Sequence, residues 1–161
     1  MSLGAGAEDA RRAADAERAR AAERDSHFAP WAGASVGEPV LVSTLSGEPS
    51  YWTVPVEREG RVIGFVRVSG AGQATAAGAF YRDPQQLSRC PSVVTGITAP
   101  EAVRLAATAV GASEDEVDAP SYVHDGPPGR EAWLVRVRTG GQHKDLLVTA
   151  AGAVDRPAGS G

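Results

Sequence analysis

Several residue types are almost missing from this chain. It has one cysteine, Cys90, one lysine, Lys144, and no asparagine, and isoleucine occurs only at Ile63 and Ile97. A single cysteine excludes an intramolecular disulfide, so nothing here favours a disulfide-stapled secreted scaffold. Because the codons for lysine, asparagine and isoleucine are AT-rich, their scarcity indicates a GC-rich genome, such as that of an actinobacterium.

Long apolar runs are also missing. No stretch approaches the roughly 20 apolar residues of a membrane-spanning helix. The segment from Met1 to Ala7 consists of small residues and is followed by charges, unlike the apolar part of a signal peptide. We therefore expect no membrane span and a cytoplasmic protein, although a secreted protein that has lost its signal peptide would look the same.

Net charge and chain length further limit the kinds of protein that this chain can be. The chain has 16 basic and 20 acidic residues, a net charge of −4, so it lacks the general basic field of a nucleic-acid-binding protein. Its 161 residues fit one medium domain or two halves of about 80 residues. Aromatic residues make up only 6%, which leaves valine, leucine and the three tryptophans to form a core.

What the chain does contain is a repeated strand pattern. A tryptophan and two valines recur at a single offset of 81 residues, in Tyr51–Val56 and again in Ala132–Val137. A glycine-bearing turn and a further alternating segment follow each copy, which predicts two related β-hairpins. The turns and following strands are Arg58–Gly60 with Val62–Val68, and Thr139–Gly141 with Lys144–Thr149.

The first half begins with a segment that favours a helix. Ala7 to Asp25 is almost entirely alanine, arginine, glutamate and aspartate, so this helix has only an alanine stripe to bury. Phe28–Trp31 is expected to plug the core. The predicted strands are Pro39–Leu45, Tyr51–Glu57, Val62–Val68 and, after the Gly/Ala stretch 70–78, a short fourth strand at Phe80–Tyr81.

The second half has the clearest helix signals. Thr98 and Glu101 have the spacing of a capping box, and Gly111 stands where a left-handed helix end is expected. We therefore predict a helix over residues 99–110. A further helical turn within Ser113–Asp118 and strands at residues 121–124, 132–138 and 144–149 follow.

This order, a helix followed by a meandering antiparallel sheet with an aromatic residue and alternating valines on one strand, resembles PepSY-type domains and the wider cystatin-like group. The match is best over Thr98–Val154, including the ending Gly152-Ala153-Val154, and Tyr51–Gly72 resembles a divergent copy. The resemblance implies a non-catalytic module that binds or inhibits a peptidase, or packs on another protein.

The expected fold class is therefore α+β, with two helix-plus-antiparallel-sheet, cystatin-like units packed together. The boundaries are a helix of the first unit within residues 1–27, its sheet in 28–82, a linker in 83–97, the second unit in 98–156 and a disordered tail in 157–161. No cofactor is expected.

Reactive groups do not form a recognisable catalytic set. Cys90 with His27, His124 or His143 is the one thiol–histidine combination available, and the histidines and acids lack metal-ligand spacing, so no metal site is predicted. A basic sheet face is the candidate binding site, for an acidic partner or a phosphate group. The alternative is that the same residues lie on a solvated sheet face and form local ion pairs. These residues are Arg67, Arg130, Arg136, Arg138 and Lys144.

We therefore expect a non-catalytic protein- or peptide-binding module, peptidase-inhibitor-like or chaperone-like, whose exposed sheet edges accept a partner's extended segment. A homodimer stays open. Two alternatives are a small-ligand binder with a pocket between sheet and alanine-rich helix, and an enzyme of the cystatin-like superfold. The enzyme requires a histidine and an acid that converge in one apolar pocket.

Overall fold

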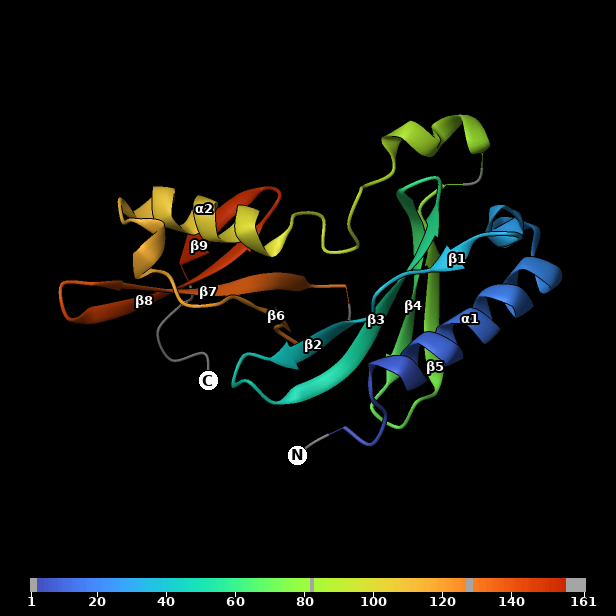
Figure 1. Ribbon diagram of the computed structural model, residues 1–161, viewed down its shortest axis with the longest axis horizontal. Coiled ribbons are helices and arrows are strands. Elements are labelled where there is room, and N and C mark those ends of the chain that lie inside the picture. The colour runs from blue at the N-terminus through green and yellow to red at the C-terminus, as the bar shows by residue number, and fades with distance from the viewer. Residues whose placement is uncertain (1–2, 82, 127–128, 156–161) are drawn as a thin grey trace. The chain divides into compact units, whose positions relative to one another are not determined.

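A computed structural model describes residues 3–81, 83–126 and 129–155 (Figure 1). It shows helices together with mostly antiparallel strands, which confirms the α+β class. The chain divides into two compact units, one of residues 1–41 and 49–94 and one of residues 42–48 and 95–161. Residues 42–48, predicted with the first sheet, therefore group with the second unit.

In the first unit an α-helix lies against an antiparallel sheet. The strands pair in the order β1-β3-β4-β5, with every pair antiparallel. The elements are α1 (Ala7–Arg24), the 3-10 helix η1 (Ser26–Trp31), β1 (Ser35–Val36), β3 (Pro49–Arg58), β4 (Arg61–Ser69), β5 (Ala74–Ala79) and the 3-10 helix η2 (Pro84–Arg89).

The alanine stripe of α1 allows close packing on this sheet. Ala10 and Ala14 are fully buried, and they share a core with Trp31 of the predicted plug and with the register partners Val54 and Val66. Burying each such valine contributes about 1.5–3 kcal/mol. Since α1 presents only alanine methyl groups to the sheet, its contribution to the stability of the unit depends on close packing against the valines rather than on large side chains.

The second unit repeats this plan. The helix α2 (Ala99–Val110) packs on a sheet in the order β2-β6-β7-β8-β9, in which β2 and β6 are parallel and the other pairs antiparallel. The remaining elements are β2 (Val40–Thr44), the 3-10 helix η3 (Glu114–Glu116), β6 (Ser121–His124), β7 (Glu131–Thr139), β8 (Gln142–Thr149) and β9 (Gly152–Asp155).

Both predicted ends of α2 are confirmed. The Thr98 hydroxyl accepts a hydrogen bond from the Glu101 amide at 3.2 Å, and the Glu101 carboxylate accepts one from the Thr98 amide at 3.4 Å. Gly111 follows the helix with φ of 68°. A capping box and a left-handed cap satisfy amides and carbonyls that a helix leaves without intrahelical partners.

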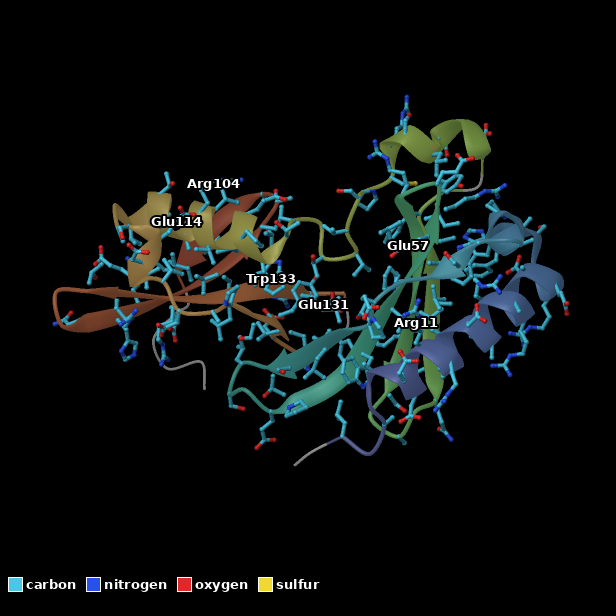
Figure 2. The ribbon with its side chains drawn as sticks, in the orientation of Figure 1. Arg11, Glu57, Arg104, Glu114, Glu131 and Trp133 are labelled. Atoms are coloured by element: carbon cyan, nitrogen blue, oxygen red, sulfur yellow. The ribbon has the colours of Figure 1, made fainter. Side chains whose placement is uncertain are left out.

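The two matched tryptophans have the same role in their units. The Trp52 indole N–H donates to the Ala5 carbonyl at 3.1 Å, and the Trp133 indole N–H donates to the Ile97 carbonyl at 3.0 Å. Each carbonyl stands two residues before the first helical residue. Figure 2 shows Trp133 beside the start of α2. Each indole therefore connects the start of a helix to the first strand of the repeated hairpin.

The repeated hairpins also share their turn. Glu59 and Gly60 have φ of 51° and 76°, and Gly140 and Gly141, 81 residues later, have 56° and 79°. Two consecutive positive φ angles define the type I′ turn that matches the twist of paired strands. Glu59 is the one residue of the four with a side chain in this backbone region.

The predicted strand at Phe80–Tyr81 is wrong, because β5 occupies Ala74–Ala79 and ends before Phe80. The Gly/Ala segment pairs with β4 as a strand, and close contacts between the two strands require glycine on both: a Cβ on Gly78 would lie 2.5 Å from the Phe65 ring. A Cβ on Gly64 of β4 would lie 2.4 Å from the Gly78 carbonyl and 2.6 Å from the Trp31 ring. The short strand β1 was not predicted, and the linker contains η2. The predicted tail at 157–161 lies outside the described residues.

Removing one indole hydrogen bond should weaken the second unit. We expect Trp133→Phe to lower the free energy of unfolding by about 1 kcal/mol, since the Ile97 carbonyl loses its donor. Urea unfolding followed by circular dichroism measures this change. Trp52→Phe should produce a loss of similar size, and wild-type stability in both variants would contradict the shared role.

The backbone at Glu59 favours glycine. We expect Glu59→Gly to raise the free energy of unfolding by roughly 0.5–1 kcal/mol, because a side chain in the left-handed region is strained. Gly140→Ala, at the equivalent position of the other hairpin, should lower it by a similar amount. Thermal unfolding of both variants compares them directly, and shifts of the same sign would rule out this explanation.

Candidate functional site

The structure does not bring the five predicted basic residues together on one face. Arg67 lies in the first unit and the other four lie in the second. Arg136 and Arg138 alternate with the fully buried Val137 and therefore face away from α2. Lys144 is the register partner of Val137 and lies on the α2 side of the sheet.

Carboxylates already pair with the four basic residues of the second unit. Arg136 makes two hydrogen bonds to Asp145, at 2.9 and 3.2 Å, and these raise the pKa of Arg136 above its ordinary value. The partners of Arg130, Arg138 and Lys144 are Asp125, Asp118 and Asp155. The basic face stays a prediction, and these pairs reduce the positive charge that it offers to an anion.

Arg67 has aromatic neighbours. Its guanidinium carbon lies 4.9 Å from the ring centroid of Tyr51 and 5.7 Å from that of Phe65. A cation over an aromatic face is attracted to the ring's negative charge. Arg67 and Phe65 alternate with the buried Val66 on β4, so this cluster lies on the sheet face opposite α1.

The single thiol is part of the first core. Cys90 is buried, its Sγ lies 3.9 Å from the Gln86 carbonyl, and burial raises its pKa. A raised pKa keeps the side chain as a thiol at neutral pH, whereas a nucleophile needs the thiolate. Among the described residues, no contact between Cys90 and a histidine is recorded.

A histidine and an acid do meet in the second unit. His124 of β6 and Glu131 of β7 are cross-strand partners, next to the pair Tyr122 and Trp133, whose ring centroids are 5.1 Å apart. Figure 2 shows Glu131 and Trp133 near the same end of β7. Burial, and then the charge of Glu131, raise the pKa of Tyr122 to about 12. This cluster combines a histidine and an acid, the two groups expected of a cystatin-like enzyme.

The apolar hollow of this unit does not include that histidine. It has a volume of about 320 Å³ and lies against strand residues that alternate with the second core, on the face opposite α2. The described lining contains Asp125, Arg130 and Glu131 but no histidine. The apolar and hydroxyl lining residues are Leu45, Val123, Ala132, Leu147, Thr149 and Val154.

In the first unit, the helix–sheet interface is filled rather than hollow. Ala10 and Ala14 are fully buried against the valines of β3 and β4. The groove beside α1 lies at its charged flank, where Arg11 pairs with Glu38 at 3.2 Å. The expected ligand pocket between sheet and alanine-rich helix is therefore not observed among the described residues.

Strand β5 is an edge of the first unit's sheet. Within the described part of the chain it pairs with β4 alone. The Phe80 amide donates to the Ile63 carbonyl at 2.9 Å, so Phe80, and by alternation Gly78, turn their backbone groups toward β4. Ala77 and Ala79 consequently point their N–H and C=O groups outward.

This edge has little of the usual protection against strand pairing. Sheet edges are commonly blocked by charged residues, proline, a bulge or a very short strand. The six residues of β5 include no charge and no proline, and the one irregularity is the unpaired Thr75 near its start. By contrast, the equivalent edge strand β9 has four residues and ends at Asp155, which pairs with Lys144 at 3.1 Å.

Aromatic side chains stand beside the open edge. The Phe65 ring lies over Gly78, where a Cβ would come within 2.5 Å of it. Its centroid is 6.0 Å from that of Phe80, which is 44% exposed. The sequence analysis missed this site because alanine and glycine are poor strand formers. The uncharged segment from Gly70 to Phe80 was the available signal.

Comparisons with known proteins do not identify a relative: no protein-family model, no curated protein and no solved structure matches this chain.

Two general findings concern membranes and metals. Across the described ranges, no helix combines the length and apolar character needed to cross a bilayer. In the same part of the chain, no three side chains of histidine, cysteine, aspartate or glutamate are grouped as ligands for a metal ion.

The raised pKa of Tyr122 gives a pH-dependent test. We expect its phenol to ionise near pH 12, and absorbance at 295 nm should lose this component in Tyr122→Phe. The neutral phenol is favoured by folding, so its stabilisation is complete below pH 10 and disappears as the pH rises toward 12. The free energy of unfolding should therefore fall more steeply over that range in the wild type than in Tyr122→Phe.

Proposed function

We propose that this chain is a non-catalytic module that holds an extended segment of a partner protein or peptide as an added strand beside β5. The observation that carries the proposal is the open edge, where Ala77 and Ala79 direct backbone donors and acceptors outward. In strand addition, main-chain hydrogen bonds supply affinity and side-chain positions supply selectivity. An uncharged edge has the backbone groups that this binding mode requires.

The arrangement of each unit supports a finer proposal about class. A helix precedes an antiparallel meander in both units, as in the PepSY-type and cystatin-like domains that the sequence resembles. We therefore place the chain with the peptidase-inhibitor-like or chaperone-like modules, which act by holding another chain. In either role, we propose that the bound segment is extended and is not chemically changed.

A proline at the outward-facing position tests the edge. Proline is tolerated on edge strands where the amide faces solvent, but it removes the donor and its ring obstructs an incoming strand. We expect Ala77→Pro to weaken binding of extended peptides at least tenfold. Fluorescence anisotropy measures it with labelled seven-residue threonine peptides that carry leucine, phenylalanine, alanine or glutamate at the centre.

Ala77→Ser is the matched control, because it keeps the amide and should bind like the wild type. Circular dichroism should show both variants folded. Amide hydrogen exchange adds a direct readout: in the free protein Ala77 and Ala79 should exchange faster than Gly78, and peptide should slow them. The proposal fails when no peptide binds wild type with a dissociation constant below about 1 mM, or when Ala77→Pro binds normally.

A further inference from the structure

Resting on that proposed function, we infer that the β5 edge selects extended segments with a large apolar side chain opposite Gly78. The open backbone groups of β5 account for binding of an extended segment. The side chains near Gly78 determine which segments bind most tightly. This selectivity depends on which sheet face each incoming side chain occupies and on what lies there.

Strand alternation determines the face. Ala77 and Ala79 pack against the core under α1, so Gly78 and Phe80 belong to the opposite face. An incoming strand that pairs with β5 places the residue opposite Gly78 on that same face, because directly opposite residues share a face. This residue therefore lies on the side that carries Phe65 and Phe80.

Because Gly78 has no side chain, the Phe65 ring is accessible beside it. The two residues are register partners, and the absence of a side chain at Gly78 allows the Phe65 ring to lie over it. The ring thus extends from β4 across β5 toward the open edge. An incoming side chain opposite Gly78 meets an aromatic ring there, where most edge strands would present their own side chain.

Phe80 completes an apolar position beside the same edge. It follows Gly78 by two residues on the same face, remains 44% exposed and lies 6.0 Å, centroid to centroid, from Phe65. A leucine or phenylalanine on the incoming strand would cover apolar surface of both rings. Burial of that surface favours association, whereas a glutamate would cover less of it; its carboxylate could still approach Arg67, whose guanidinium carbon lies 5.7 Å from the Phe65 ring centroid.

The occupant is therefore an extended peptide segment with one large apolar residue at its centre. A second copy of this chain is a different occupant, since two β5 edges would pair with each other and place small residues, rather than large ones, beside Phe65. Size-exclusion chromatography separates these two cases because self-pairing produces a dimer that Ala77→Pro abolishes.

The experiment compares the central residue of the peptide across three proteins. With wild type, we expect the leucine and phenylalanine peptides to bind about tenfold more tightly than the alanine peptide, and more tightly than the glutamate peptide, which covers less apolar surface. Phe80→Ala should bring the leucine and alanine peptides within about threefold of each other. Leu105→Ala, which removes an exposed apolar side chain of the other unit, should keep the wild-type preference.

The outcomes distinguish this inference from the proposed function. Equal affinity for all four peptides, with binding still lost in Ala77→Pro, would overturn the selectivity and leave strand addition intact. An unchanged preference in Phe80→Ala would also overturn it. Absence of peptide binding, or a wild-type dimer that Ala77→Pro dissociates, would overturn both.

Discussion

A tryptophan hydrogen bond at the start of each helix is the constraint on which both units depend. Both helices bury mainly alanine: the fully buried residues are Ala10 and Ala14 in α1 and Ala102 and Ala106 in α2. Such a helix gains stability only when it lies close to the sheet. The indoles of Trp52 and Trp133 fix that approach by bonding to the chain just before each helix begins. The valines that follow each tryptophan on its strand then pack against the helix.

Local chemistry explains which parts of this fold are predictable from sequence. The cap formed by Thr98 and Glu101, the left-handed Gly111 and the repeated hairpins each depend on residues close together in the chain. The α+β class follows from the order of these elements. Alternating valines identify the buried strand face for the same reason, because the period of a strand is a local property.

The missed features depend on residues far apart in the chain. The segment that forms β5 packs Gly78 against the Phe65 ring of the neighbouring strand, where a Cβ would come within 2.5 Å, a contact that its own alanines and glycines do not reveal. Strand alternation predicts that Arg136 and Arg138 share one face, yet Lys144 lies on the other face of the sheet because of the β7–β8 register. The candidate site belongs to this class, since it needs Phe65 of one strand over Gly78 of the next.

Under the proposed function, the difference between the equivalent edge strands β5 and β9 sets the number of extended segments that one chain holds. A module with two open edges would join one extended segment to another and could propagate along a chain of partners. Here β9 is short and ends in an ion pair, while β5 is uncharged along its length. Under the proposed function, the repeated plan therefore holds one extended segment, at β5, and the module ends a chain of partners instead of extending it.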